Sequence, residues 1–196
     1  MQRPPEVIRA PDVGVVLRRH RIEDLDALHD AIEASRDHLR PFMFWADQSR
    51  ADTAAFLDAA TRGWDAGQEF GYLIVDGADG SILGGGGLHR RGPPETLEIG
   101  YWRRAGAGGR GIVTALASAL TAAGLALPGI ERVEIHCDVA NAASEAVPRR
   151  LGYSMAGIID TPVRAPAETG RHAVWVWPPE GANAQSGGSD KASSIA

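Results

Sequence analysis

A glycine-rich turn between an apolar strand and an apolar helix constrains this chain more than any other stretch. Residues 97–102 are apolar and aromatic enough for a buried strand, and Val113, Leu116 and Leu120 recur at helical spacing after Ile112. Between them lie Gly106, Gly108, Gly109 and Gly111. A glycine turn that opens a helix leaves backbone N–H groups unpaired at the positive end of the helix dipole. We therefore predict that the turn binds a phosphate or pyrophosphate group.

Other phosphate-binding motifs fit this turn less well. The six residues from Gly106 to Gly111 match G-x-G-x-x-G, and Asp138 ends the next predicted strand, so a dinucleotide-binding fold is an alternative. However, two arginines and an alanine separate the strand from the glycines, and no second βαβ half follows. A P-loop is excluded because no Lys-Ser/Thr follows the glycines. A plain glycine-rich connection does not explain four glycines with arginines beside them.

Length, charge and cysteine content narrow the class of protein. The chain has 196 residues, a net charge of −5 and a hydrophobic fraction of 44%, which suits one globular domain. The negative charge gives no general attraction to nucleic acid or an anionic membrane. A single cysteine, Cys137, no membrane-length apolar run and no signal-peptide core favour a cytoplasmic location. We expect a flexible N-terminus over 1–7, a domain over 8–178 and a disordered tail, rich in Gly, Ser and Ala, over 179–196.

Hydrophobic periodicity predicts a mixed α/β fold, with strands and helices in one sheet-containing domain. We expect strands over 13–17, 70–75, 81–88, 97–102, 132–138, 153–159 and 172–177, and helices over 22–32, 51–64, 112–127 and part of 141–153. The glycines at 84–87 imply a bulge or a close backbone approach in their strand. Pro41 makes the run of Phe42, Met43, Phe44 and Trp45 more loop-like than helical. Most of that run is expected in the core, with the lining of a groove as the alternative.

Three motifs together give the chain a family resemblance. They are Glu-Ile-Gly-Tyr-Trp at 98–102, Gly-Arg-Gly-Ile-Val-Thr at 109–114, and the segment 132–153 with Asn-x-x-Ser and Arg-Leu-Gly-Tyr. In this combination the chain resembles the GNAT superfamily of acyl-CoA N-acyltransferases. With Ser-Arg-Asp-His-Leu-Arg at 35–40 and Trp45, it is similar to the Rim-type ribosomal-protein serine/alanine N-terminal acetyltransferases. The resemblance covers residues 8–177 and implies the GNAT fold, a mostly antiparallel sheet with a splayed parallel pair of strands that binds acyl-CoA.

The resemblance also implies which residues contact acetyl-CoA, the expected co-substrate. The pyrophosphate would lie on the backbone amides of residues 109–112, the strand ending at Arg103 would pair with the pantetheine, and Asn141 would lie near the thioester. The implied contacts are Trp102, Arg103, Arg104, Gly106, Gly108, Gly109, Arg110, Gly111, Ile112, Thr114 and Asn141. The chain departs from the family pattern at two positions. Gly106 replaces the long side chain that begins the family's turn motif, and Pro148 stands where many members carry a catalytic tyrosine.

The catalytic candidates are Glu98 and Ser144. Glu98 either faces the acceptor amine as a general base or is an exposed strand residue. Ser144 is either the N-terminal cap of a short helix or a group that contacts the leaving thiolate. His89 and His136 have the same ambiguity, since a lone histidine is usually a packing residue. Cys137 has no nucleophile signature, and no group of residues has metal-ligand spacing, so no metal is expected.

The expected function is direct transfer of acetyl from acetyl-CoA to an amine, either a protein N-terminus or a small amine. The missing tyrosine prompts one alternative, a non-catalytic acyl-CoA-binding module, and the G-x-G-x-x-G match prompts a second, a dinucleotide-binding oxidoreductase. Partners are acetyl-CoA and the amine acceptor, without nucleic acid or membrane, and a homodimer is a further expectation.

Overall fold

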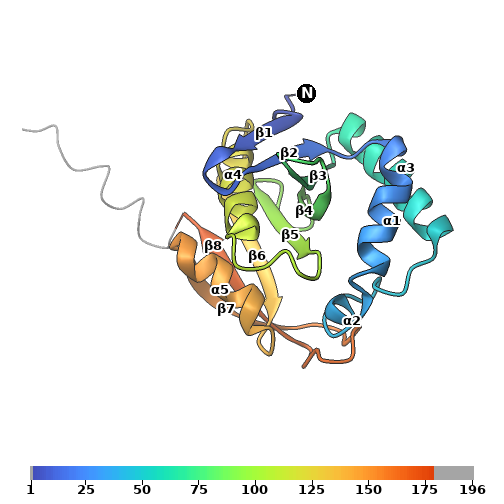
Figure 1. Ribbon diagram of the computed structural model, residues 1–196. Helices are drawn as coiled ribbons and strands as arrows, with labels where there is room; N and C mark the ends of the chain where they lie inside the picture. The colour runs from blue at the N-terminus through green and yellow to red at the C-terminus, as the bar shows by residue number, and fades with distance from the viewer. Residues whose placement is uncertain (1, 179–196) are drawn as a thin grey trace, which may run out of the picture.

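A mixed eight-stranded sheet with helices on both faces forms the body of the protein (Figure 1). The computed structural model describes residues 2–178. The strands are β1 Val7–Ala10, β2 Val15–Arg19, β3 Glu69–Asp76, β4 Ile82–His89, β5 Thr96–Arg103, β6 Arg132–Asp138, β7 Ser154–Asp160 and β8 Arg171–Trp177. The helices are α1 Leu25–Glu33, α2 Arg36–Leu39, α3 Arg50–Ala66, α4 Ile112–Leu125 and α5 Ala142–Leu151, with short 3-10 turns at Pro11–Val13 and Ile22–Asp24.

The strand order is β1-β2-β3-β4-β5-β6-β8-β7. Every neighbouring pair is antiparallel except β5 and β6, which are parallel. The predicted sheet, mostly antiparallel with one parallel pair, is confirmed. A dinucleotide-binding fold requires a mostly parallel sheet, so the topology excludes that alternative.

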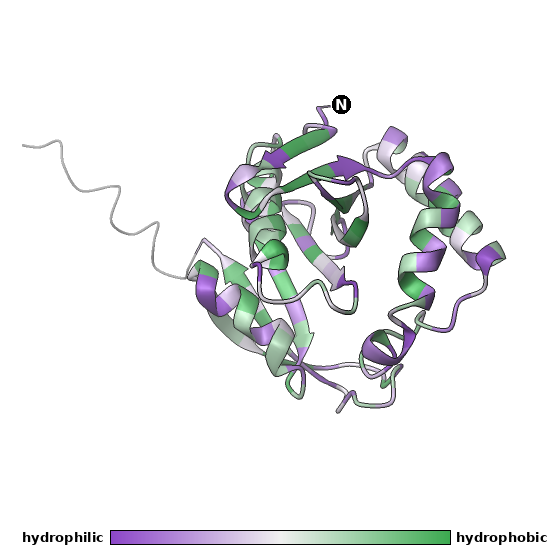
Figure 2. Cartoon of the chain, in the orientation of Figure 1, coloured by the Kyte–Doolittle hydropathy of each residue, from purple (hydrophilic) through white to green (hydrophobic). Residues whose placement is uncertain are grey.

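Hydrophobic residues on the two faces of the sheet make two cores. On one face Leu116 and Leu120 of α4 are fully buried against Leu97 and Ile99 of β5. On the other face Leu28 and Ile32 of α1 and Leu57 of α3 bury Leu73 of β3. Fully burying one such side chain stabilises the fold by roughly 1.5–3 kcal/mol. Figure 2 shows the difference between the helices: α4, which has no charged residue, is apolar over most of its length, whereas α1 and α3 alternate apolar and polar faces.

The glycine run of β4 lets the backbone and α4 approach closely. A Cβ atom on Gly86 would lie 2.5 Å from the carbonyl oxygen of Gly100 and 2.6 Å from a Leu116 methyl group. Beside this run, the β3–β4 register shifts between Ile74 and Val75. Of the two alternatives predicted for residues 84–87, a bulge or a close approach, the close approach is confirmed, and the register shift lies just before the run.

Some element bounds differ from those that the sequence predicts. Strand β1 is new: it has four residues that alternate between exposed and half-buried, so it carries little hydrophobic signal. The sheet therefore begins at Val7, one residue before the predicted start of the domain. The segment before it is also attached to the domain, because the carbonyl oxygen of Pro5 accepts a hydrogen bond from the Tyr72 hydroxyl at 2.7 Å. Strand β2 begins at Val15 because Pro11–Val13 forms a 3-10 turn that ends on Gly14 at φ 66°. The predicted tail over 179–196 lies outside the described residues.

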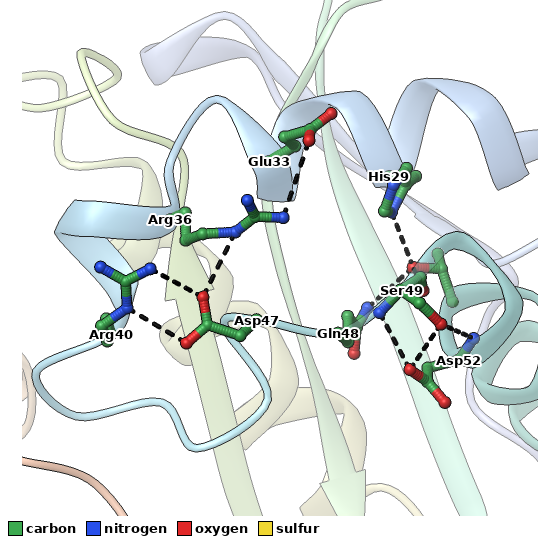
Figure 3. A network of polar contacts seen from close by, with 9 residues as sticks. His29, Glu33, Arg36, Arg40, Asp47, Gln48, Ser49 and Asp52 are labelled. Carbon is green, nitrogen blue, oxygen red and sulfur yellow. Dashed lines mark hydrogen bonds and ion pairs between the residues drawn. The ribbon is translucent and has the colours of Figure 1, made fainter.

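The run from Phe42 to Trp45 is divided between core and surface. Met43 and Trp45 pack against the second core, whereas Phe44 is 56% exposed. Asp47, at the end of this loop, forms ion pairs with two arginines (Figure 3). Its carboxylate lies 2.8 Å from the Arg40 guanidinium and 3.4 Å from the Arg36 guanidinium. These ion pairs hold the run against α2.

Helix α3, the longest helix within residues 2–178, has a well-defined start and end. Ser49 caps it in a reciprocal capping box with Asp52, and Gly67 ends it in the left-handed conformation. No helix within residues 2–178 is long and apolar enough to cross a bilayer.

Candidate active site

The parallel strands β5 and β6 separate after a short contact. Their pairing covers Thr96 with Arg132, Leu97 with Val133 and Glu98 with Glu134. Beyond this point β5 stays paired with β4 as far as Arg103, while β6 turns to pair with β8. From Ile99 to Arg103, the edge of β5 that faces β6 therefore has no strand partner among the described residues. An open strand edge can bind an extended amide-containing ligand as an added strand, which fits the pantetheine arm of acetyl-CoA.

The glycine turn leads from β5 into α4. Gly106, Gly109 and Gly111 have φ values of 79°, 81° and 71°, and Gly111 is the N-terminal cap of α4. An added Cβ on Gly106 or Gly109 would meet nothing within 4 Å, so the backbone conformation, not crowding, requires glycine at both. Successive amides in such a turn, at the start of a 14-residue helix, form an anion-binding concavity. The backbone therefore fits a pyrophosphate group.

The arginines near the turn divide into two groups. The Arg103 guanidinium lies beside the turn, donating to the Arg104 carbonyl oxygen at 2.9 Å and lying 3.4 Å from the position of a Cβ on Gly108. The Arg110 guanidinium points away instead, donating to Asp76 at 2.7 Å and to the Val13 carbonyl oxygen at 3.1 Å. Its hydrogen bond holds the pKa of the Asp76 carboxyl below the usual range. Arg110 therefore presents its backbone amide at the turn, whereas its guanidinium is directed to Asp76 and Val13.

Three other residues that were expected to contact acetyl-CoA are partly buried or packed against neighbours, so only some of their atoms are accessible to it. Ile112 is 1% exposed, so its backbone amide is what the turn presents. The Trp102 indole packs edge-on against Trp45, with 5.9 Å between ring centres, which leaves its backbone on the open strand edge. Thr114 is half-buried in the first turn of α4.

Sequence reasoning missed Ser35, which connects α1 to the glycine turn. Its hydroxyl donates to the Ala31 carbonyl oxygen at 2.6 Å and accepts from the Ala105 amide at 2.9 Å. The side chain is 1% exposed. No local sequence signal predicts this contact, because Ser35 and Ala105 are 70 residues apart.

Asn141, not Ser144, caps helix α5, so the cap interpretation of Ser144 is wrong. The Asn141 side-chain oxygen accepts the Ser144 amide at 3.1 Å. The Ser144 hydroxyl is therefore free of the capping role and donates to the Tyr101 hydroxyl at 3.1 Å. Tyr101 in turn donates to the Ser144 carbonyl oxygen at 3.0 Å. Burial raises the pKa of Tyr101, so the phenol stays protonated and can act as a donor.

A group of titratable side chains lies on the opposite face of the sheet, where β5 and β6 begin to separate. Glu98 accepts Arg91 at 3.0 Å and lies 3.7 Å from Nδ1 of His136. Nε2 of His136 lies 2.7 Å from Glu134, which also receives Arg132 at 2.6 Å. The sequence-predicted candidates Glu98 and His136 therefore lie together, half-buried, on this face.

His89 lies beside the same group, and Cys137 lies apart from it. Nδ1 of His89 is 3.5 Å from the Glu69 carboxylate, and His89 is the register partner of Glu98. Cys137 is buried on the other face, where burial raises the pKa of its thiol to about 11. The thiol is therefore protonated at neutral pH, in agreement with the absence of a nucleophile signature.

The loop over residues 161–170 crosses from β7 and β8 to α2 (Figure 1). The Ala167 amide donates to the Pro41 carbonyl oxygen at 2.9 Å, and the Arg164 guanidinium lies 3.5 Å from the Phe44 ring centre. At its other end the loop is held by Asp138, which accepts the Thr169 amide at 2.7 Å and the Gly170 amide at 3.2 Å. Burial alone would raise the pKa of Asp138, but these hydrogen bonds outweigh burial and lower it. The loop therefore closes the same side of the molecule as the run 42–45.

No cluster of three or more metal-ligating side chains occurs within residues 2–178.

A model of the acetyltransferase (GNAT) domain family matches residues 15–154, which include β2 through the first residue of β7. The chain belongs to the GNAT acetyltransferases. The match contains the open edge of β5, the glycine turn and Ser144.

Known proteins similar to this GNAT enzyme include one curated relative and several solved structures. "Putative ribosomal N-acetyltransferase YdaF" of Bacillus subtilis (strain 168) is 30% identical over 147 residues, 71% of this chain and 77% of the relative. The structure of RimL, a ribosomal L7/L12 alpha-N-protein acetyltransferase in complex with coenzyme A, superposes with a TM-score of 0.79 at 22% identity, covering 87% of this chain and 97% of that one. The microcin C7 self-immunity acetyltransferase MccE, in complex with acetyl-CoA and AMP, gives 0.76 at 20% identity, covering 83% and 91%.

Membership of this family confirms the predicted fold and the predicted class of enzyme. The protein is an N-acetyltransferase with acetyl-CoA as its co-substrate. This replaces both the non-catalytic and the oxidoreductase alternatives.

Proposed function

We propose that this GNAT enzyme acetylates the α-amino group of a protein N-terminus by direct transfer from acetyl-CoA. One observation carries the proposal: two sets of polar groups flank the separation of β5 and β6 from opposite faces of the sheet. Glu98 lies on the face covered by α1, and the Ser144–Tyr101 pair lies on the face covered by α4 and α5. A thioester held on the open edge of β5 would lie between them.

In this proposal the co-substrate is bound chiefly by backbone. The pyrophosphate lies on the amides of residues 109–112, and the pantetheine pairs with β5 near Trp102 and Arg103. Arg103 and Arg104 supply positive charge, Gly106 and Gly108 keep the turn open, and Thr114 and Asn141 add polar contacts. The positive φ angles at the turn and the open strand edge support this arrangement.

Transfer needs no acyl-enzyme. The amine nitrogen attacks the thioester carbon, the C–N bond forms and the nitrogen gives up its proton. The C–S bond breaks, the thiolate takes the proton of the Ser144 hydroxyl, which is hydrogen-bonded to Tyr101, and Ser144 regains a proton from water. Glu98 is the proposed base, directly or through water. Alignment of the two substrates can contribute about 7–11 kcal/mol, and a β5 amide facing the thioester oxygen about 3 kcal/mol.

The chemistry of the amine favours a protein N-terminus over a lysine side chain. An α-amine has a pKa of about 7.7–8.0, so making it neutral at pH 7 costs about 1–1.4 kcal/mol. A lysine amine, with a pKa of about 10.4, costs over three times as much. A weak, ion-paired base such as Glu98 suits the first acceptor. The names of YdaF and RimL point to the same class of acceptor, ribosomal proteins.

Acceptor screening tests this proposal. Thiol release from acetyl-CoA is measured with peptides that begin with Ser or Ala, with the same peptides blocked at the N-terminus but carrying lysine, and with a polyamine. We expect release with the free N-termini and little with the blocked peptides. Equal rates on blocked peptides, or transfer to the polyamine alone, would refute the N-terminal acceptor. A cytoplasmic location, a homodimer, and a lack of nucleic-acid or membrane partners stay predictions.

A further inference from the structure

The glycine turn after β5 has to be held in one conformation before its backbone can bind an anion. Four of the six residues from Gly106 to Gly111 are glycines, and glycine loses more conformational freedom on ordering than any other residue. A turn that is ordered before its ligand arrives binds more tightly, because binding does not have to supply the ordering. The contacts that fix this turn therefore set the affinity for acetyl-CoA, if the pyrophosphate lies there as in the proposed function.

The end of the turn that leads into α4 is fixed by the helix and by an ion pair. The Gly111 carbonyl oxygen accepts the Ala115 amide at 2.9 Å, in the first turn of α4. The Arg110 guanidinium donates to Asp76 at 2.7 Å, but the arginine side chain is 43% exposed. Ion pairs at the surface contribute little to stability. This end of the turn therefore depends mainly on α4.

The end of the turn that follows β5 is fixed by β4 and by Ser35. The Arg104 amide donates to the Leu83 carbonyl oxygen of β4 at 2.8 Å. The next amide, that of Ala105, donates to the Ser35 hydroxyl at 2.9 Å. Gly106 follows directly, with φ 79°. Ser35 therefore holds the last residue before the chain enters the glycine positions.

Ser35 is a rigid support because two helices fix it. Its hydroxyl donates to the Ala31 carbonyl oxygen of α1 at 2.6 Å, and its amide donates to the Ile32 carbonyl oxygen at 2.9 Å. Its carbonyl oxygen accepts the Leu39 amide of α2 at 2.9 Å. Ala31, Ile32 and Leu39 are all buried in the second core. The core, and not the turn, therefore determines where the Ser35 hydroxyl lies.

We propose that Ser35 is a positioning residue for acetyl-CoA: its hydroxyl fixes the Ala105 amide and so keeps the glycine turn in the conformation that binds the pyrophosphate. The Ser35 side chain is 1% exposed, so it acts through the turn and not by contact with the co-substrate. Without the hydroxyl, the half-buried Ala105 amide loses its partner, which favours conformations in which that amide reaches water. The apparent affinity then falls with the fraction of molecules whose turn is still ordered.

The test is the affinity for coenzyme A in Ser35→Ala, measured by calorimetry without an acceptor. We expect the Kd to rise about tenfold, and the KM for acetyl-CoA to rise by a similar factor. At saturating acetyl-CoA, kcat should stay within about twofold of wild type, because the groups proposed for the chemistry are unchanged. Ser35→Thr, which keeps a hydroxyl, should restore most of the affinity.

Hydrogen exchange gives a local readout of the same effect. The Ala105 amide should exchange faster in free Ser35→Ala than in the free wild type, because its hydrogen bond is gone. Coenzyme A should slow this exchange again in the variant, since binding selects the ordered turn. An Ala105 amide that exchanges equally in both free proteins would overturn the proposal.

Thr121→Ala is the matched control. Thr121 of α4 is also buried, and its hydroxyl donates to the Ala117 carbonyl oxygen at 2.6 Å and hydrogen-bonds to the Tyr153 hydroxyl. This variant should lose a similar stability to urea and keep the wild-type Kd. Ser35→Cys keeps the side-chain shape with a weaker acceptor, so it replaces Ser35→Ala if that variant does not fold, with the same expected rise in Kd.

Three results would overturn the proposal. They are a wild-type Kd in the folded Ser35 variants, a loss of kcat at unchanged Kd, and an equal loss of affinity in Thr121→Ala or Ser35→Thr. Gly109→Val separates this inference from the proposed function. If Gly109→Val binds coenzyme A normally, the pyrophosphate lies elsewhere and the proposed arrangement fails. If Gly109→Val loses affinity and the Ser35 variants do not, the turn is correct and only the role of Ser35 is wrong.

Discussion

Tyr101 and Ser144 are joined by two hydrogen bonds, at 3.0 and 3.1 Å, although 43 residues separate them. The pair connects β5 to the first turn of α5, on the side of β5 that β6 leaves open. A serine backed by a protonated phenol can deliver a proton to a leaving thiolate. This pair could therefore take the place of the catalytic tyrosine for which the sequence has Pro148.

Removing the Ser144 hydroxyl should slow transfer moderately. A coenzyme A thiolate is a stable leaving group, so we expect Ser144→Ala to lower kcat about tenfold, below the 10²–10⁴ typical of a required acid. Tyr101→Phe should have a smaller effect with Ser144 present and almost none in Ser144→Ala, because the two act in series. Steady-state kinetics on the two variants and the double variant measure this coupling. Fully additive losses would mean that the hydroxyls act independently.

Neutralising Glu98 should have the largest effect on kcat. If Glu98 accepts the amine proton, Glu98→Gln lowers kcat about 10²-fold or more at neutral pH. Acetyl-CoA affinity, measured by calorimetry, should remain, since the predicted contacts to the co-substrate are elsewhere. Glu95→Gln, in the exposed loop before β5, is the control. A Glu98→Gln enzyme with the wild-type rate and pH profile would remove Glu98 as the base.

A side chain on the glycine turn should abolish co-substrate binding. Gly109 has φ 81°, and a valine there strains the backbone and covers the amides proposed to hold the pyrophosphate. Gly129, in the turn after α4, has φ 75° and the same open surroundings, so Gly129→Val is a matched control. Both should lose a similar stability, about 1–2 kcal/mol. Only Gly109→Val should lose coenzyme A binding by calorimetry; normal affinity would refute this assignment of the turn.

His20 should make the protein less stable in mild acid. Burial lowers its pKa from 6.5 to about 4, so below pH 6.5 the unfolded chain takes up a proton that the folded protein excludes. The free energy of unfolding should fall as the pH drops from 6.5 to 4, by about 3 kcal/mol in all. Urea unfolding at pH 7 and 4.5 measures the change. His20→Gln should reduce it, and an unchanged pH dependence in that variant would show that His20 is not its source.

Loosening the loop 161–170 should increase its local opening. Asp138→Asn puts an NH2 group near amides that need an acceptor, at a cost of about 1–3 kcal/mol. We expect faster hydrogen exchange over 161–170. Because the pKa of Asp138 is lowered, the carboxylate stabilises the fold above its unfolded pKa, and that contribution is lost as the pH falls through the folded value. The difference from wild type should therefore shrink in acid. Equal exchange in both proteins at pH 7 would contradict this role.

Local properties of the sequence determined the organising strand–turn–helix unit and most of the other elements. Apolar periodicity at 97–102 and after Ile112 predicted β5 and α4, and the glycines between them predicted an anion-binding turn, because φ preference and helical spacing act between near neighbours. The family resemblance extended this to acetyl-CoA. The family match confirmed acetyl-CoA as the co-substrate, whereas its binding at this turn stays a prediction. Prediction from the sequence failed where a strand was too short to show an apolar pattern, as at β1. It also failed where a polar side chain had several possible hydrogen-bond partners, as at Ser144.

Only the tertiary structure decided which side chains meet. The Arg110 guanidinium bonds to Asp76 rather than facing the turn, and Asn141 takes the capping role that the sequence allowed for Ser144. Glu98 and His136 come together because β5 and β6 are neighbours for three residue pairs and then separate. Asp138 holds a loop 31 residues later in the chain. In each case a polar group had several partners of suitable chemistry, and the folded backbone determined which one lay within hydrogen-bonding distance.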